Sequence, residues 1–109
     1  MITVEIRKSG EEYAGFSSKG HAGYAEEGYD IICAAVSVLT VNTINSIEKF
    51  TEDAFKAEAA DGMVRWKFTE LPLSKEAHLL MDSLVLGLQE IQENYGKKYL
   101  KIVEKHLTK

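Results

Sequence analysis

The sequence predicts a two-layer α+β domain in which two long helices pack on a four-stranded sheet, in the order ββαββα. Three observations predict this fold: stretches that alternate apolar and polar residues, an Asp-Gly pair between two such stretches, and two apolar segments of helical length. The chain of 109 residues can bury one core and is too short for two. Residues 1–109 are therefore expected to form a single domain.

The N-terminal stretch is typical of a half-buried strand. Ile2, Val4 and Ile6 alternate with polar residues, which places the apolar side chains on one face. Ser9 to Glu12 has the composition of a turn, and Tyr13 to Gly20 is a weaker strand. These residues predict a first hairpin.

The segment IICAAVSVLTVNTINSIEKF, residues 31–50, predicts a helix of about five turns. Its first half is apolar on almost every side, so we expect it to be buried on most sides. Asp30 stands where an N-cap is wanted, and its carboxylate can accept a hydrogen bond from the backbone N–H of Ile32 or Cys33. Cys33 is therefore expected in the first turn.

Asp61 and Gly62 predict a second hairpin, because this pair favours a tight turn that needs positive φ at both central residues. A two-residue turn also fixes the register of the two strands. The expected pairs are Phe55 with Phe68, Ala57 with Trp66 and Ala59 with Val64 on an apolar face, and Glu58 with Arg65 and Lys56 with Lys67 on the other.

The segment after Pro72 predicts the second long helix, with Ser74 as its N-cap. One apolar stripe follows at helical spacing: Ala77, Met81, Leu84, Leu88, Ile91 and Tyr95. Gly96 either ends this helix or kinks it before Tyr99 to Leu107 continues.

An uninterrupted helix from Ser74 to Lys105 would span roughly 45 Å, which is longer than a domain of this size is wide. Leu80, Val85 and Leu86 would then lack cover within one subunit. We therefore expect a homodimer built on this helix.

Composition disfavours several classes of protein. No run approaches the eighteen or more apolar residues of a membrane span, so no membrane partner is expected. The N-terminus has no signal-peptide pattern and the single cysteine cannot form an internal disulfide, which together favour the cytoplasm. A net charge of −4 disfavours direct binding of nucleic acid as the main role.

Five lysines gather toward the C-terminus: Lys97, Lys98, Lys101, Lys105 and Lys109. They are interspersed with apolar residues at helical spacing, and the simplest interpretation is a solvated helix face. The alternative is a lysine-bearing helix that binds RNA.

Cys33 and His21 suggest a chemical hypothesis. The dipole and unpaired N–H groups of a helix N-terminus favour a thiolate, and the N–H of Cys33 or Ala34 could donate to a carbonyl oxygen under attack. His21 ends the second strand, and the loop of residues 22–29 is long enough to return it to Cys33 as a general base. Ser37, one helical turn later, would be a polar group in the same site.

The loop is a candidate cover for a substrate, with flexible glycines and aromatic side chains. Its candidate substrate-binding residues are Ala22, Gly23, Tyr24, Gly28 and Tyr29.

These residues by themselves leave alternatives open. Cys33 could be an inert core residue, since free cysteine is among the most buried residue types. Asp30 caps the helix, orients His21, or does both. His78 and His106 match no zinc spacing with the one cysteine, and the glycines form no phosphate-binding pattern, so no metal and no cofactor are expected.

The stretch GHAGYAEEGYDIICAAVS, residues 20–37, resembles the signature of the Prp family of ribosomal-processing cysteine proteases. The chain also agrees with that family in length, in both hairpins and in its long final helix. Ile32 stands where many members have valine, which is a conservative difference. The resemblance implies His21 as general base and Cys33 as nucleophile, with Asp30 and Ser37 supporting the site.

The resemblance also implies a reaction and a partner. Family members are small dimers that remove a short N-terminal extension from large-subunit ribosomal protein twenty-seven, near a pair of aromatic residues, before or during ribosome assembly. We therefore expect a cytoplasmic cysteine endopeptidase whose partner is a peptide segment of that precursor. The alternative is a non-enzymatic ribosome-assembly or RNA-associated module that does not use Cys33.

Overall fold

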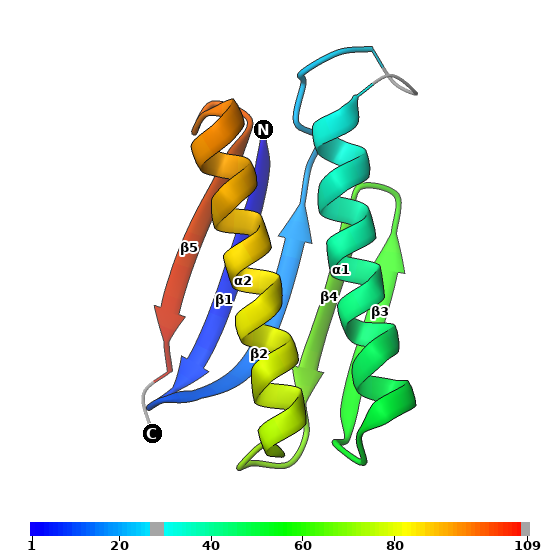
Figure 1. The fold of residues 1–109 in the computed structure, drawn as a ribbon, viewed down its shortest axis with the longest axis vertical. Helices are drawn as coiled ribbons and strands as arrows, with labels where there is room; N and C mark the ends of the chain where they lie inside the picture. Colours follow the sequence, from blue (N-terminus) through cyan, green and yellow to red (C-terminus); the bar gives the residue numbers. More distant parts are fainter. Residues whose placement is uncertain (27–29, 108–109) are drawn as a thin grey trace.

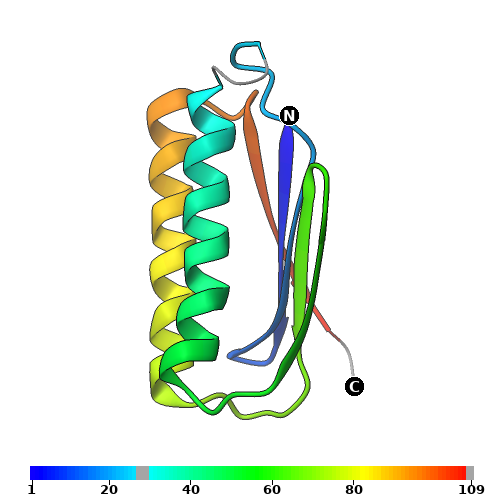
Figure 2. The ribbon, with the colours of Figure 1, turned by 90° about the vertical axis from the view of Figure 1, so that its right-hand side faces the viewer.

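The computed structural model describes residues 1–26 and 30–107. In chain order the elements are β1 (Ile2–Ser9), β2 (Glu12–Lys19), α1 (Ile31–Phe50), β3 (Phe55–Ala60), β4 (Met63–Phe68), α2 (Lys75–Tyr95) and β5 (Leu100–His106). The strands form one sheet in the order β3-β4-β2-β1-β5. Both helices lie side by side on one face of this sheet and leave the other face open (Figure 1, Figure 2).

The predicted two-layer α+β architecture is confirmed, but the four-stranded sheet and the order ββαββα are wrong in detail. A fifth strand, β5, follows α2 and pairs parallel with β1. The helix ends because Gly96 adopts a φ of +105°, a conformation that glycine tolerates, and its N–H closes the last turn on the carbonyl of Gln92. The chain then turns back to the sheet edge.

β5 completes the core on its inner side. Leu100 pairs with Ile2 and is fully buried, and Ile102 packs against the core. The side-chain amide of Gln92 donates a 2.9 Å hydrogen bond to the carbonyl of Leu100, which attaches the strand to α2. The apolar residues after Gly96 therefore belong to a strand, not to a continued helix.

Because α2 ends at Tyr95, the prediction of a homodimer from an overlong helix no longer holds. α2 has 21 residues, and Leu80 and Val85 pack against the core of the same chain. Leu86 remains exposed. The C-terminal lysines are not on a helix either: Lys101 and Lys105 lie on β5. Lys97 and Lys98 lie between α2 and β5, and Lys109 lies outside the described residues.

The two hairpins are confirmed. All five predicted pairs between β3 and β4 are present. Gly62 has the expected positive φ of +68°, but Asp61 does not, because only glycines have positive φ among residues 1–26 and 30–107, so the predicted turn conformation is wrong at Asp61. Burial on the inner face is uneven, because Trp66 and Phe68 are buried whereas Ala57, on the edge strand β3, is exposed. The ring of Trp66 stacks on Phe16 of β2 with 4.5 Å between ring centroids, which joins the two hairpins in the core.

α1 buries one stripe of residues and not most of its circumference, so that prediction is wrong. The buried residues are Ile32, Val36, Thr40, Thr43 and Ile47, whereas Ile31 and Val38 are exposed. By length and composition alone α1 could cross a membrane, although the sequence predicted no membrane-spanning segment. The core helix of a globular protein meets the same criteria of length and composition. Here its stripe packs on the sheet.

Asp53 connects the ends of the two helices. Ser74 caps α2 as predicted, since its Oγ accepts a 3.0 Å hydrogen bond from the N–H of Ala77. The carboxylate of Asp53, in the loop after α1, accepts from both the N–H and the hydroxyl of Ser74. Burial acts to raise the pKa of Asp53, but the hydrogen bonds from Ser74 outweigh it and lower that pKa.

The placement of β5 predicts unequal effects for two leucine truncations near the C-terminus. Leu100→Ala removes a fully buried side chain and is expected to lower the free energy of unfolding by about 3 kcal/mol. Leu107→Ala, the matched control, alters a side chain that is 44% exposed and is expected to cost less than about 1 kcal/mol. Urea denaturation followed by circular dichroism measures both, and equal losses would contradict the inward position of Leu100.

Candidate active site

Asp30 fixes the start of α1 and the loop before it. Its Oδ1 accepts hydrogen bonds from the backbone N–H groups of Ile32 and Cys33, both at 3.0 Å. Its Oδ2 accepts from the N–H of Tyr24 at 3.1 Å. Burial acts to raise the pKa of this carboxyl, but the hydrogen bonds from Cys33, Tyr24 and Ile32 outweigh it, so the pKa lies below its usual value. The predicted N-cap is confirmed, and these bonds are to backbone amides.

Cys33 is half-buried in the first turn of α1, with its sulfur at the edge of the core. The backbone N–H of Ala22 donates a 3.1 Å hydrogen bond to Sγ. Burial raises the pKa of the thiol, the Ala22 hydrogen bond opposes it, and the Asp30 carboxylate raises it further, so that the pKa lies above its ordinary value. At neutral pH the resting side chain is therefore the thiol.

The expectation that the helix N-terminus holds Cys33 as a thiolate is thus wrong for this structure. The N–H groups that would stabilise the anion are occupied by Asp30, which also brings a negative charge close to the sulfur. The expected oxyanion donors are occupied as well. The N–H of Cys33 bonds the Asp30 carboxylate, and that of Ala34 bonds the Asp30 carbonyl at 3.1 Å. The amide directed at the sulfur is that of Ala22.

His21 follows the end of β2 and packs against the β3–β4 turn. The N–H of Gly20 donates a 2.8 Å hydrogen bond to the carbonyl of Gly62, which fixes the backbone next to the histidine. A methyl group added at Gly62 would lie 2.9 Å from Nε2 of His21, so the imidazole rests directly on that glycine. The close approach needs a residue without a side chain at position 62.

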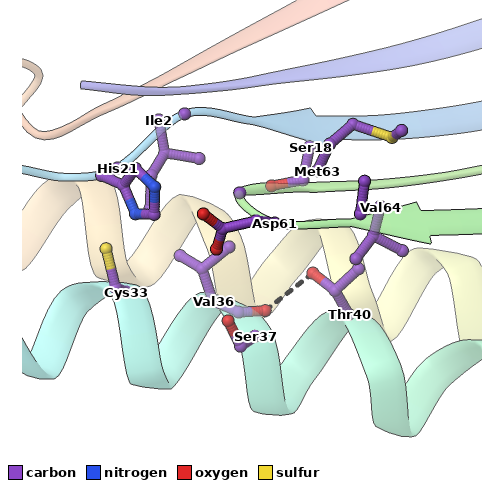
Figure 3. Close-up of a pocket in the computed structure, with 13 residues that line it drawn as sticks. Ile2, Ser18, His21, Cys33, Val36, Ser37, Thr40, Asp61, Met63 and Val64 are labelled. Atoms are coloured by element: carbon purple, nitrogen blue, oxygen red, sulfur yellow. Dashed lines mark hydrogen bonds between the residues drawn. The ribbon is translucent and has the colours of Figure 1, made fainter. Parts of the chain in front are cut away.

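The structure brings His21 and Cys33 to one site, as predicted. Figure 3 shows the imidazole and the sulfur facing the same hollow, from the end of β2 and the start of α1. Within residues 1–26 and 30–107, no hydrogen bond joins the two side chains directly. Such contacts are often long in a free enzyme and shorten when the substrate is bound.

Two adjoining hollows meet at this pair, and both are lined by His21, Cys33, Ser37 and Asp61. The first has a volume of about 260 Å³ and runs between α1 and the strands, where Ile2, Val36 and Val64 give it apolar walls. The second, of about 390 Å³, runs toward the loop and is lined in addition by Gly23, Ala25, Asp30 and Ala34. A peptide could therefore pass the sulfur on both sides.

Asp61 is the site residue that sequence reasoning missed, because it was interpreted only as part of a turn. The structure directs its carboxylate into the site next to His21 and Ser37 (Figure 3). The contact between Gly20 and Gly62 brings this turn to the site, and nothing local in the sequence indicates that contact. Ser37, which was predicted as a polar group in the site, lies where expected.

The structure describes three of the five loop residues that were predicted to bind substrate. Ala22 is buried, and it contacts the sulfur through its backbone. Gly23 lines the second hollow. The ring of Tyr24 packs edge-on against Tyr95 and Tyr99, which anchors the loop to the end of α2 and to the residue before β5. Gly28 and Tyr29 lie outside the described residues.

The other two histidines lie away from this pair. His78 contacts Asp82 and the ring of Tyr13, and His106 contacts Glu104. Among residues 1–26 and 30–107, no group of three His, Cys, Asp or Glu side chains is placed to hold a metal ion.

Comparison with known proteins gives a consistent set of matches. A family model described as cysteine protease Prp matches residues 1–101. The ribosomal processing cysteine protease Prp of Staphylococcus aureus (strain Mu50) is 28% identical over 99 residues, which cover 89% of this chain and 93% of the relative.

Two crystal structures of the essential ribosomal processing protease Prp from S. aureus have the same fold as this chain. One contains a covalently linked product peptide and matches with a TM-score of 0.90 and 28% identity over 96% of this chain and 100% of the other. The second contains a substrate peptide and matches with a TM-score of 0.84 and 27% identity over the same shares.

The contact between His21 and Gly62 predicts a specific defect. Gly62→Ala should displace the imidazole and lower kcat/KM for peptide cleavage by about a hundredfold, as misplacement by about 1 Å can. Gly10→Ala is the matched control, since Gly10 has a similar φ of +62° in the other hairpin turn and no atom within 4 Å of the added methyl. Both should lose about 1–2 kcal/mol of stability from backbone strain. Equal activity in the two variants would contradict the proposed contact.

The environment of Cys33 predicts an unusual alkylation profile. The rate of iodoacetamide labelling of this single cysteine should inflect above the free-thiol pKa of about 8.5. Asp30→Asn should move the inflection to lower pH, because removal of the carboxylate charge favours the thiolate. Asp53→Asn, which removes an equal charge beside the N-cap of α2, should leave it unchanged. An inflection well below 8.5 in the wild-type protein would refute this description of the thiol.

Proposed function

Because the chain belongs to the Prp family of cysteine proteases, we propose that it removes the N-terminal extension of large-subunit ribosomal protein twenty-seven during ribosome assembly, with His21 and Cys33 as its catalytic pair. One observation carries the proposal. The only cysteine of the chain and the histidine of the family signature face one hollow, and that hollow continues past the sulfur on both sides.

Acylation begins from a neutral thiol. Sγ of Cys33 forms a bond to the scissile carbonyl carbon, its proton passes to the imidazole of His21, and the carbonyl π electrons move to oxygen. The tetrahedral intermediate then collapses: the C–N bond breaks, the leaving amine takes the proton from His21, and the N-terminal fragment remains as a thioester on Cys33. His21 must act during the attack, because burial and Asp30 keep the pKa of the thiol above its usual value.

Deacylation uses the same two groups. His21 takes a proton from a water molecule while the oxygen of that water attacks the thioester carbonyl carbon. The C–S bond then breaks and releases the carboxylic acid. The departing sulfur carries negative charge until it regains its proton, and the N–H of Ala22 donates to it at that stage. The covalently linked product peptide in the S. aureus relative supports a covalent intermediate of this kind.

The apolar hollow supports a preference for an apolar side chain next to the cleaved bond. Ile2, Val36 and Val64 line it, and its volume of about 260 Å³ suits one large apolar or aromatic side chain. This agrees with the aromatic pair near the cleavage point that the family resemblance implies. Ser37 and Asp61 at the mouth provide polar partners for the peptide backbone.

The proposal includes a cytoplasmic homodimer, as the resemblance implies. The helix argument for the dimer no longer holds, but Val38 and Val41 on α1 and Leu79 and Leu86 on α2 are exposed on the outer helix faces. These apolar side chains are candidates for the contact between subunits.

The catalytic roles are tested with the precursor protein carrying its N-terminal extension, by mass spectrometry of the products. Cys33→Ala is expected to abolish cleavage, and His21→Ala to lower kcat/KM by at least about a hundredfold. His106→Ala is the matched control for the histidine, since that side chain is exposed at the far end of β5 and should be dispensable. Wild-type rates in folded Cys33→Ala protein would reject the assignment.

A further inference from the structure

The open face of the sheet gathers positive charge on a protein whose net charge is negative. The open face is defined here by the outward residues of three rows across the strands. Its seven basic residues are Arg7, Lys19, Lys56, Arg65, Lys67, Lys101 and Lys105, and its two acidic residues are Glu5 and Glu58. The rest of the chain holds six basic and fifteen acidic residues, so the net charge of −4 conceals a basic face.

The sheet pairing explains how distant parts of the sequence build this face. One row crosses all five strands without an acidic residue. From β5 to β3 its members are Lys105, Arg7, Gly15, Lys67 and Lys56. Adjacent strands are about 4.8 Å apart, so Lys105 and Arg7 are neighbours on one side of Gly15, and Lys67 and Lys56 are neighbours on the other. At the end of the sheet beyond this row, the carboxylate of Glu12 accepts a hydrogen bond from the N–H of Leu73.

The cations of the open face are mostly unneutralised. Glu5 pairs with Arg7 at 2.9 Å, and Glu58 pairs with Arg65. The five lysines form no ion pair with any residue in the described ranges 1–26 and 30–107. All five are exposed. Lysines on one face that lack anionic partners repel one another, and a polyanion relieves that repulsion.

The shape of the open face favours the backbone of a nucleic acid duplex. Gly15 has no side chain and lies on the middle strand, so the centre of the open face does not protrude. A guanidinium nitrogen of Arg7 lies 3.8 Å from the position that a Cβ at Gly15 would take. A shallow hollow of about 280 Å³ adjoins it, lined by Arg7, Lys56, Arg65 and Lys67 among others. No aromatic side chain belongs to the three rows, so the open face lacks the stacking platform that single strands need.

We propose that the open face binds the phosphate backbone of double-stranded RNA, independently of base sequence, in addition to the protease activity. The choice of RNA over other polyanions rests on the proposed function, because a precursor processed during ribosome assembly is surrounded by folded RNA. The helices lie on the opposite side of the sheet (Figure 2), and residues of α1 line both hollows, so a bound duplex leaves the active site open to peptide.

This binding revises the expectation that the chain has no nucleic-acid partner. The predicted alternative placed RNA on a lysine-bearing C-terminal helix. In the structure Lys101 and Lys105 are on β5, and they join cations from four other strands. The proposed RNA binding does not involve Cys33.

The test measures binding of a fluorescent RNA duplex of about 20 base pairs to the full-length protein. This protein carries Cys33→Ala, so that binding is measured without peptide cleavage. Five phosphate contacts, one for each unpaired lysine, predict a slope of about −4.5 for log K against log salt and roughly 500-fold weaker binding at 200 than at 50 mM. The triple variant Lys56→Glu, Lys67→Glu, Lys105→Glu should bind at least about tenfold more weakly at 50 mM and reduce the slope by about three.

A matched triple variant controls for net charge. Lys49→Glu, Lys75→Glu and Lys97→Glu change the same number of exposed lysines elsewhere, and this variant should bind within about twofold of the parent. In the Cys33-containing protein, both triple variants should cleave the free precursor at the wild-type rate, so a failure of the protease assignment would be seen separately.

Three results would overturn the proposal. They are an absence of duplex binding at 50 mM salt, an equal loss in both triple variants, and competition by polyglutamate as effective as that by unlabelled duplex at equal charge. The last result would assign the open face to an acidic protein partner.

Discussion

The carboxylate of Asp30 is the interaction on which the site depends. It accepts hydrogen bonds from three backbone amides and thereby begins α1, ties the preceding loop to the helix, and places Cys33 in the first turn. The same negative charge opposes ionisation of the sulfur. The chain therefore holds the proposed nucleophile in a fixed position and keeps it protonated, so the proposed chemistry requires a nearby proton acceptor.

A second constraint joins the remainder of the site to this helix start. The hydrogen bond from Gly20 to Gly62 holds the β3–β4 turn against the end of β2, and the bare Cα of Gly62 leaves room for His21. The turn also carries Asp61 into the wall shared by both hollows. The site is thus built from the ends of four elements, which leaves the core to the sheet and helices and leaves the open face free for another partner.

Local signals in the sequence predicted the elements that depend on local interactions. The Asp61-Gly62 turn determined the register of the second hairpin, and Asp30 and Ser74 marked helix starts, because caps and tight turns involve residues a few positions apart. The resemblance over residues 20–37 indicated the pairing of His21 with Cys33. Contacts between residues far apart in the chain could not be predicted from local signals in the sequence.

β5 was missed because residues 99–107 fit a helical spacing as well as an alternating one, and the parallel partner is at the other end of the chain. Asp61 was missed for a similar reason, since only the folded backbone brings it to His21. The direction of the Cys33 pKa was wrong because a helix N-terminus stabilises an anion only when its amides are free, and sequence does not show what occupies them. The basic residues of the open face were missed because the net charge of the whole chain is negative.

The central claim is that the Cys33 thiol becomes covalently attached to the N-terminal fragment. Acid quenching of wild-type protein and precursor within the first turnover, followed by intact-mass measurement and peptide mapping, tests it directly. The account predicts an adduct on Cys33 equal to the fragment less one water. Product formed in that turnover with no adduct, or an adduct on another residue, would contradict it.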